Sequence, residues 1–492
     1  MSKLTTALCR IFYIIFACVF AGIAIAALFA AQKNPEEYIF AIRPSRTVIF
    51  CVLWAVIFGA VIFALEKFTA FFEKRFAVIT AVFTALYFAV ALFVGFQLMV
   101  VPLYDAEALF EGAKQIAASR NLGAYDGYYY IRPNNIGAAV LLSALFKLFG
   151  TQNAHVAFII LNCICLVLSL LLLTLAAKLA FGKKRAIFAA VLMLFCLPLY
   201  GYAAIFYTDI LAMPFALGAV VLYLQYSKSK KLWQLIASAL CVGFGMNIKF
   251  TVVIVAIAIV IHAVLQKNTR QLLCIVLIFL LGIGACQLVN KAQTTWLLPD
   301  SERRQNDKLP YTHWPMMGLA GDGRWNNADE VFSASFNTYK ESVAADKEVI
   351  SKRLSDYGIS GVAALLGRKS MYTFADGTFN LASMADDGAV KQSFLHNYVL
   401  YTSPQFVLWF YITTAYLIVI YLASAAFDVR DAFKNAKPDA AFLARMCFFG
   451  LWCFLMMWES NSRYLVHFMP LLLLCSAGYS PLFVKKPHTL PF

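Results

Sequence analysis

Four short groups of charged, amide and aromatic side chains stand at the ends of long apolar segments. They are Asp105 with Glu107 in YDAE, Tyr207 with Asp209 in IFYTD, Asn247 with Lys249 in GFGMNIKF, and Glu459 with Arg463 in WESNSRY. A charged side chain at the end of a membrane span is costly unless it is solvated or paired. We therefore expect the four groups to meet in one polar cavity at one face of a membrane.

Asp105 is the candidate general base of such a cavity. A carboxylate beside a hydroxyl group can accept its proton as the oxygen attacks a carbon atom, and this kind of catalysis is worth about 10²–10⁴-fold in rate. Asp105 could equally be the N-cap of the helix that follows, and the two roles are compatible. Glu107 could position the attacking group or help to bind a divalent ion, although an acid in a first helical turn also complements the helix dipole.

Lys249 and Arg463 suit an anionic substrate, because a phosphate leaving group needs its developing negative charge stabilised. Each side chain could instead extend toward the lipid interface or pair with a carboxylate, and Glu459 lies four residues before Arg463. The residues predicted to shape the substrate site are Tyr207, Asp209, Asn247 and Glu459, with helix capping as the alternative role of Asp209.

The sequence predicts no metal site. His155, His313, His396 and His467 are scattered singly, and the 12 Cys contain no CxxC pair. All the Cys lie in apolar segments, so structural disulfides are not expected. No cofactor is predicted as obligatory, although a divalent metal could take part.

The whole chain has the composition of a multi-pass membrane protein. Of its 492 residues, 62% are hydrophobic and 14% are charged, and the mean hydropathy is +0.73. Runs such as 156–177 are nearly free of polar residues, which favours membrane-spanning helices, and the alternation typical of a β-barrel is absent. The net charge of +15 lies mostly in loops between spans, where it indicates topology and attraction to anionic lipid rather than nucleic-acid binding.

The predicted fold is an all-α polytopic bundle of about twelve spans with both termini in the cytoplasm. The spans are expected near residues 10–31, 46–65, 76–101, 154–180, 186–204, 209–226, 232–248, 250–266, 271–290, 404–427, 441–458 and 463–481. This order places the loops EKFTAFFEKR, GKKR, SKSKK and QKNTR, and a tail with Lys485 and Lys486, in the cytoplasm, as the positive-inside rule requires. The four chemical groups then face outside.

Two polar stretches, 102–153 and 291–403, are predicted to be external. In the first, the stretch from Val101 to Arg120 has Leu109, Ala113, Ile116 and Ala117 spaced as one helical face, so we expect a helix that lies along the membrane interface with that face in the acyl boundary. IRPNNIGAAVLLSALFKLFG predicts a second interfacial helix.

The second external stretch is expected to be partly folded. NADEVFSASFNTYKESVAADKEVISKRL is typical of a helix, and GVAALLG is expected to dip into the interface. The predicted divisions of the chain are an N-terminal hairpin (1–75), a transmembrane core (76–290), an extracytoplasmic region (291–403) and C-terminal spans (404–492).

The order of these motifs resembles the GT-C superfamily of integral membrane glycosyltransferases, which includes protein mannosyltransferases and aminoarabinose lipid A transferases. The resemblance rests on YDAE in the first large external loop, the interfacial helices after it, HVAFIILNCICLVLSLLLLTLAAKLAFGKKR, YTD, the GFGMNIK turn and a late SRY. It implies a polyprenyl-phosphate-linked sugar as donor, inversion at the anomeric carbon and an external-loop acid as base, a position that Asp105 matches. YTHWPMMGL and RKSMYTFADGTF are similar to Gram-positive bacterial members, which implies a cell-wall polymer, glycolipid or protein as acceptor.

The leading hypothesis is therefore a glycosyltransferase of the plasma membrane with its active site facing outside. Its partners would be membrane lipid, the polyprenyl-phosphate sugar and an acceptor that the sequence does not identify. The alternative is a transporter or lipid flippase, for which the Gly-interrupted spans around GFGMN could form a discontinuous helix at a substrate site. The missing inverted repeat and the long external stretch argue against transport. The third possibility, a non-catalytic membrane scaffold, does not explain why acidic and basic residues are predicted to gather at one face.

The predicted topology can be tested with single cysteines in a cysteine-free background. A membrane-impermeant maleimide should label intact cells that carry a cysteine in place of Gln115 or Lys340, but not one in place of Lys184. Labelling after permeabilisation is the control for reactivity. Protection of position 115 in intact cells would contradict an outward-facing site.

Overall fold

The computed structural model describes residues 3–29, 43–266, 268–385, 388–434 and 436–478. Eight helices in these ranges are long and apolar enough to cross a membrane. They are α1 (Lys3–Phe29), α2 (Pro44–Lys67), α4 (Phe76–Gln97), α8 (Ala154–Phe181), α11 (Thr208–Ser229), α14 (Thr269–Leu297), α21 (Phe406–Lys434) and α22 (Ala440–Met457).

Further apolar helices occupy the remaining predicted spans. The pair α9 (Lys183–Leu194) and α10 (Pro198–Gly201) would make one span bent by 61°. Three shorter helices are α12 (Leu232–Ile248), α13 (Val253–Leu265) and α23 (Met469–Ala477). Each of the predicted spans therefore falls on a helix, and the prediction of an all-α polytopic bundle is confirmed. The predicted tail with Lys485 and Lys486 lies outside the described residues.

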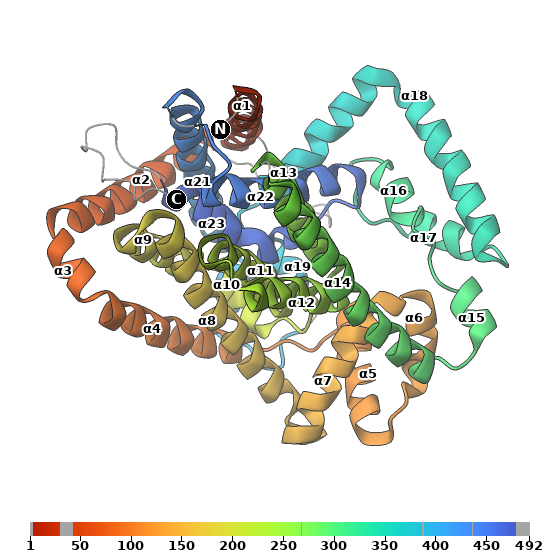
Figure 1. The fold of residues 1–492 in the computed structure, drawn as a ribbon. Coiled ribbons are helices and arrows are strands. Elements are labelled where there is room, and N and C mark those ends of the chain that lie inside the picture. The colour runs from red at the N-terminus through yellow and green to blue at the C-terminus, as the bar shows by residue number, and fades with distance from the viewer. Residues whose placement is uncertain (1–2, 30–42, 267, 386–387, 435, 479–492) are drawn as a thin grey trace.

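The other helices lie mostly in the two polar stretches predicted to be external. They are α5 (Tyr104–Ser119), α6 (Asp126–Ile131), α7 (Ile136–Phe149), α15 (Ser301–Asn306), α16 (His313–Gly318), α17 (Asn327–Ala334), α18 (Tyr339–Phe374), α19 (Leu381–Ala385) and α20 (His396–Val399), and α3 (Thr69–Lys74) links α2 to α4. Figure 1 shows α5 to α7 at the lower edge of the molecule and α15 to α18 along its right side, outside the central helices.

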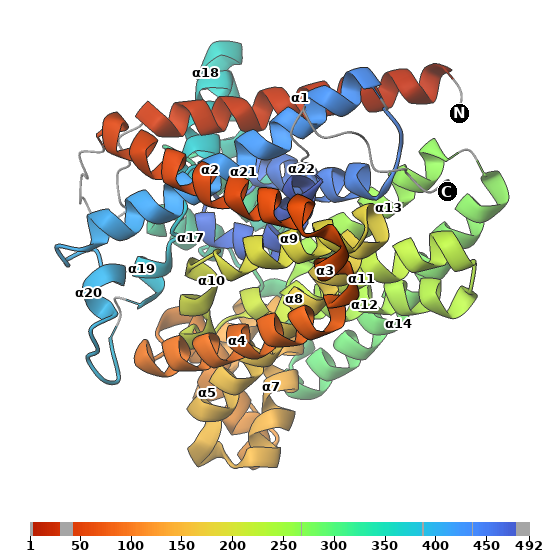
Figure 2. The same cartoon turned by 90° about the vertical axis from the view of Figure 1, so that its left-hand side faces the viewer.

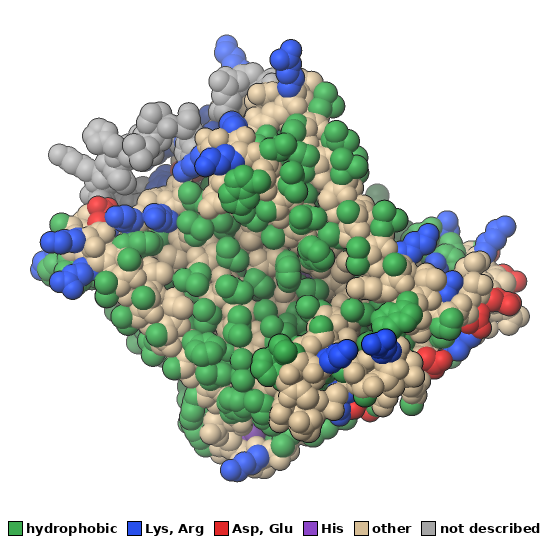
Figure 3. All heavy atoms as spheres, turned by 60° about the horizontal axis from the view of Figure 1, so that its bottom comes forward, with side chains coloured by type: hydrophobic (Ala, Val, Ile, Leu, Met, Phe, Trp, Pro, Cys, Tyr) green, Lys and Arg blue, Asp and Glu red, His purple; other side chains and the backbone are tan. Residues whose placement is uncertain are grey.

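Apolar side chains cover much of the outer surface. Figure 3 shows a face on which hydrophobic side chains spread across the centre, while most charged side chains gather toward the edges. On α14, Leu273, Leu280 and Leu288 are each at least 65% exposed. An apolar surface of this extent is expected to contact lipid.

The N-terminal helices pack against a C-terminal span. Arg10 of α1 donates a hydrogen bond to the carbonyl of Ala432 (2.9 Å), and Trp54 of α2 donates one to the carbonyl of Ile412 (2.9 Å). Phe20 of α1 stacks on Tyr421 of α21 at 5.3 Å between ring centroids. Figure 2 shows α1 and α2 alongside α21, so the predicted N-terminal hairpin shares its packing surface with the C-terminal spans.

Helices α12 and α13 form a hairpin beside α11. The Ser229 hydroxyl, at the end of α11, donates to the Gln234 side chain near the start of α12, and the Tyr223 hydroxyl contacts His262 near the end of α13 (2.9 Å). The start of α12 and the end of α13 therefore lie at the same end of the bundle. The turn between them, at Lys249, lies at the other end, so α12 and α13 are not two halves of one discontinuous span.

The apolar face of α5 packs within the protein. Leu109, Ala113 and Ile116 are buried, and Phe110 meets Phe146 of α7 edge to face at 5.3 Å. The expectation that this face lies in the acyl boundary is therefore wrong. An apolar helix face can be buried against lipid or against another apolar helix, and the sequence pattern is the same in both cases. Here α7 packs against α5.

Helix α18 runs from the polar stretch 291–403 into the bundle. It bends at Gly358, whose φ of +55° is readily adopted by glycine, and it includes the GVAALLG segment. Beyond that segment Lys369 and Phe374 are fully buried, and Phe374 contacts Phe20 of α1 and Phe448 of α22 at 6.0 Å. The polar stretch 291–403 is thus anchored in the helical bundle.

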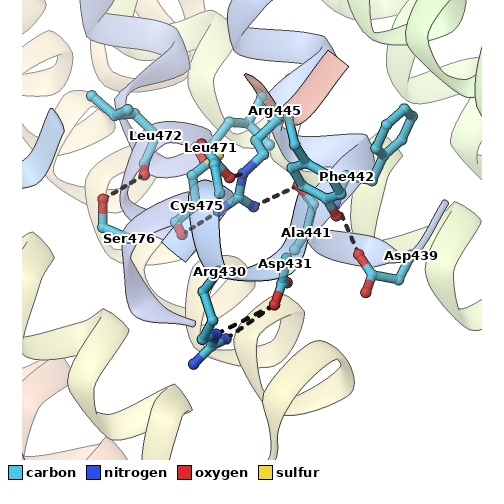
Figure 4. Close-up of polar contacts among 12 residues, drawn as sticks. Arg430, Asp431, Asp439, Ala441, Phe442, Arg445, Leu471, Leu472, Cys475 and Ser476 are labelled. Atoms are coloured by element: carbon cyan, nitrogen blue, oxygen red, sulfur yellow. Dashed lines mark hydrogen bonds and ion pairs between the residues drawn. The ribbon is translucent and has the colours of Figure 1, made fainter. Parts of the chain in front are cut away.

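Arg445 of α22 is a fully buried charge that joins four helices. Its guanidinium pairs with Asp428 of α21 and donates to the carbonyl of Cys475 on α23 (3.1 Å), while the ring of Tyr13 on α1 lies 5.6 Å away. Figure 4 shows Arg445 between Ala441 and Cys475, with Arg430 and Asp431 as a separate pair. Removing one partner of a buried pair leaves an uncompensated charge.

We predict that Arg445→Met lowers the free energy of unfolding by about 3–5 kcal/mol, because it strands the buried Asp428 carboxylate. The double variant Arg445→Met, Asp428→Leu should recover much of this loss. Thermal unfolding in detergent measures both, with Arg430→Met at the partly exposed pair as the matched control. A double variant as unstable as the single one would contradict the assigned pairing.

Candidate functional site

Three segments that are far apart in the sequence meet at the start of α11. Asp209, in the first turn of α11, is almost fully buried. Its Oδ1 lies 2.8 Å from Nζ of Lys249, at the turn between α12 and α13, and its Oδ2 lies 3.7 Å from Nε of Arg463. Arg463 belongs to the 3₁₀ helix η6 (Ser462–Phe468). We call these three residues the buried cluster.

Two tyrosine rings flank both cations of the buried cluster. The Lys249 ammonium lies 5.8 Å from the ring centroid of Tyr207 and 5.0 Å from that of Tyr464. The Arg463 guanidinium lies 4.6 Å and 5.5 Å from the same two rings. Aromatic faces stabilise desolvated cations, so the rings hold the two charges in place beside Asp209.

Asp105 adjoins the buried cluster through Tyr207. The Tyr207 hydroxyl donates to Oδ2 of Asp105 at 3.3 Å, and the Asp105 side chain is 42% exposed. The N-cap of α5 is Leu103, without a side-chain capping bond, so Asp105 is not the cap. The residue between them, Tyr104, has a φ of +52°, a conformation that is uncommon for a side chain of this size.

Asp209 is not a helix cap either. The N-cap of α11 is Tyr207, which makes no side-chain capping bond. Both carboxylate oxygens of Asp209 are directed at cations, so ion pairing, and not capping, accounts for the carboxylate.

Arg132 connects Asp105 to the polar stretch 291–403. Its Nε lies 3.7 Å from Oδ1 of Asp105, and its guanidinium also pairs with Glu330 of α17. Trp325 donates to the other oxygen of Glu330 at 2.7 Å. Burial favours the neutral acid, but the hydrogen bonds from Trp325 and Arg132 together lower the pKa of Glu330, which keeps this carboxylate available as a partner of Arg132.

Glu459 reaches the buried cluster through Tyr464. The Tyr464 hydroxyl donates to Oε2 of Glu459 at 3.0 Å, and burial raises the pKa of Glu459. The loop that carries Glu459 is fixed by Lys369 of α18, which donates to the carbonyls of Trp458 (2.6 Å) and Gly318 (2.9 Å). Burial lowers the pKa of the Lys369 ammonium to about 8, although Glu459 opposes this shift.

A polar layer behind Arg463 holds η6 in place. Ser462 donates to Oδ2 of Asp376 (2.6 Å), and the side chain of Asn380 donates to that of Asn461 (3.4 Å). Asp376 also accepts from the backbone amide of Asn380 (2.9 Å). Sequence reasoning missed these residues, together with Arg132, Glu330, Lys369 and Tyr464. Polar residues that interrupt apolar segments, as in RKSMYTFADGTF, are the sequence pattern that could have indicated some of them.

Two predicted site residues lie in other contacts. Glu107 accepts a hydrogen bond from the Tyr125 hydroxyl (3.0 Å). Asn247 donates to the carbonyl of Cys286 (3.1 Å) and accepts from Gln287 (2.8 Å), both on α14. Neither takes part in the contacts that join Asp105, Tyr207 and the buried cluster.

The position of Asn247 is set by a close approach of α7. A β-carbon at Gly137 would lie 2.4 Å from the backbone oxygen of Asn247, so only glycine allows the two backbones this proximity. Asn247 thereby fixes α12 between α7 and α14.

The site as a whole combines an accessible carboxylate with two cations whose side chains are only 10% and 13% exposed. Among the described residues, no group of three His, Cys, Asp or Glu side chains could hold a metal ion together. The buried cluster has two basic side chains, Lys249 and Arg463, beside the carboxylate of Asp209. Glu459 is a second acid near both cations, and burial raises its pKa and so favours its neutral form. Lys249 and Arg463 are therefore the groups of the cluster that could contact an anion. Asp105, at its open edge, can accept a proton.

Several solved structures are similar to the chain at low sequence identity. ArnT from Cupriavidus metallidurans bound to undecaprenyl phosphate is 12% identical over 81% of this chain and 77% of that chain, with a TM-score of 0.35. The archaeal oligosaccharyltransferase AglB from Archaeoglobus fulgidus, in complex with an inhibitory peptide and a dolichol-phosphate, is 11% identical over 81% of this chain and 56% of that chain, with a TM-score of 0.31.

At the level of sequence, no curated protein matches the chain. A family described as "Conserved hypothetical integral membrane protein" matches residues 1–481. This range includes every described residue of the bundle and of the candidate site. The chain therefore belongs to this family of integral membrane proteins.

Proposed function

We propose that the protein is a membrane glycosyltransferase that moves a sugar from a polyprenyl-phosphate donor to an extracytoplasmic hydroxyl group. The observation that carries the proposal is the contact between Tyr207 and Asp105, which places an accessible carboxylate beside the buried cations Lys249 and Arg463. A glycosyl transfer from a lipid phosphate needs both parts, a base for the acceptor and positive charge for the leaving group.

In the proposed reaction Asp105 takes the proton of the acceptor hydroxyl as its oxygen attacks the anomeric carbon. The new carbon–oxygen bond forms on the face opposite the phosphate, so the configuration inverts. The bond between the anomeric carbon and the phosphate oxygen breaks, and its electron pair stays on the phosphate. Lys249 and Arg463 stabilise the charge that develops on that oxygen.

The remaining predicted residues have supporting roles in this proposal. Asp209 holds the two cations at a fixed separation, because both pair with its carboxylate. Tyr207 and Glu459 shape the sugar or acceptor site from either side of the cations. Glu107, through Tyr125, and Asn247, through α14, fix the elements that carry the site.

The proposed setting is the plasma membrane with the site facing outside. The balance of acids and bases in the stretches around Asp105 and Glu330, and the basic loops at the opposite ends of the spans, support this orientation. The acceptor would be a cell-wall polymer, a glycolipid or a protein, and a divalent metal is not needed for the step as written.

The transporter alternative has lost its main support. It relied on a discontinuous span around GFGMN, whereas α12 and α13 form a hairpin whose two outer ends meet near His262. Transport of the donor is therefore the alternative that the experiment below must distinguish from glycosyl transfer.

The proposal predicts turnover that depends on Asp105. Purified protein in liposomes, given a panel of radiolabelled polyprenyl-phosphate sugars and cell-wall extract, should release polyprenyl phosphate from one donor. Asp105→Asn should lower this rate at least about a hundredfold, as expected for loss of a general base. Glu111→Gln is the matched control, because Glu111 lies on the same helix and pairs with Lys114, and this variant should keep the wild-type rate.

Two results would contradict the proposal. Full activity of Asp105→Asn would remove Asp105 as the base. Saturable donor binding with no release of polyprenyl phosphate, accompanied by movement of the donor between leaflets, would favour the transporter or flippase.

A further inference from the structure

A cavity lies at the opposite end of α11 from the candidate site. It has a volume of about 410 Å³ and is lined by residues of α1, α8, α11 and α13 and of the segment that leads into α22. Asp209 and Lys228 stand at the two ends of the 22-residue helix α11, which at 1.5 Å per residue are roughly 30 Å apart. The two sites therefore serve opposite faces of the bundle.

Three lysines supply the polar side of this cavity. Lys228 and Lys230 come from the end of α11, and Lys437 comes from the link between α21 and α22. Lys228 donates to the carbonyl of Leu179 at the end of α8 (2.8 Å), and Lys230 contacts the side chain of Gln271 at 3.5 Å. Lysines grouped in this way favour an anion with several oxygen acceptors.

The carboxylate in the lining is already engaged. Asp439 is the N-cap of α22 and accepts a hydrogen bond from the backbone amide of Phe442 at 3.0 Å. A carboxylate in this position is stabilised by the positive end of the helix dipole. Lys437 also interacts electrostatically with Asp439. Three lysines stand against this one carboxylate, so the lining has more basic than acidic side chains.

The other side of the cavity is apolar. Leu179, Leu224 and Leu265 line it from three different helices, α8, α11 and α13. His262 closes the wall, with one ring nitrogen 2.9 Å from the Tyr223 hydroxyl and the other 3.1 Å from the carbonyl of Pro438. A free phosphate ion would gain nothing from the leucines, whereas a lipid brings an acyl chain to them.

We propose that this cavity binds one anionic phospholipid. Its phosphodiester group would lie among Lys228, Lys230 and Lys437, and the first carbons of its acyl chain would lie against Leu224 and the neighbouring leucines. Basic pockets between transmembrane helices are typical sites for such head groups. The bound lipid would join the ends of α1, α8, α11 and α13 to the segment before α22, and would stabilise this end of the bundle.

The test compares retained lipid in wild type and in K228Q/K230Q/K437Q. Each protein is reconstituted in nanodiscs of phosphatidylglycerol and phosphatidylcholine, re-extracted, and assayed by native mass spectrometry for bound phosphatidylglycerol and by thermal unfolding. We expect the triple variant to retain phosphatidylglycerol at least about tenfold less, since each lysine near an anionic lipid contributes about 1 kcal/mol. The wild-type gain in unfolding temperature in phosphatidylglycerol should shrink with it.

The matched control removes three basic charges from the same end of the protein outside the cavity, as K67Q/K74Q/K183Q, and should retain lipid as wild type does. Because the first triple variant could fail to fold, L265W, which fills the apolar side without changing charge, should also reduce retention. Retention unchanged in both cavity variants, or lost equally in the control, would overturn the proposal. So would a thermal gain reproduced by millimolar inorganic phosphate in phosphatidylcholine nanodiscs, because the ligand would then be free phosphate.

Discussion

The candidate site depends on one carboxylate buried between two cations. Burying Asp209, Lys249 and Arg463 costs several kcal/mol per ion unless each finds a partner of opposite charge. Lys249 lies 2.8 Å from one oxygen of Asp209, and Arg463 lies 3.7 Å from the other, beyond hydrogen-bond distance. The pairs fix the start of α11, the turn of the α12–α13 hairpin and the helix η6 relative to one another. The three segments are therefore held by charge as well as by packing, with both cations on the same carboxylate.

Polar contacts connect the buried cluster to the segments around it. Tyr207 lies between the cluster and Asp105, so the accessible carboxylate is near the cations without neutralising them. Arg132 then connects Asp105 to Glu330, and Lys369 fixes the loop that carries Glu459. The polar stretch 291–403 thus contributes contacts to the site, and a movement of α17 would change the contacts of Arg132 with Asp105. At the other end of α11, the cavity proposed to bind a phospholipid likewise places basic side chains where an anion could lie.

The sequence predicted the spans well and the contacts between them only in part. A span is a local property, since each apolar run carries its own signal, and charged residues at span ends indicated that Asp209, Lys249 and Arg463 would meet. Partners such as Arg132 and Tyr464 depend on tertiary packing, which leaves no local pattern. Glu107 and Asp105 stand two residues apart and point to different sides of α5, so only the orientation of that helix separates their contacts. The apolar face of α5 was expected to contact lipid but packs against α7, because the same apolar pattern suits either partner.

The central claim is that the buried cluster receives the phosphate of a polyprenyl-phosphate lipid. Cryo-electron microscopy of the protein in nanodiscs with a polyprenyl phosphate tests it most directly, because it locates the phosphate without requiring the acceptor. The account predicts phosphate density within about 4 Å of Lys249 and Arg463, with the lipid chain leaving between the helices toward the membrane. Phosphate density only among Lys228, Lys230 and Lys437, or an undisturbed buried cluster at saturating lipid, would contradict it.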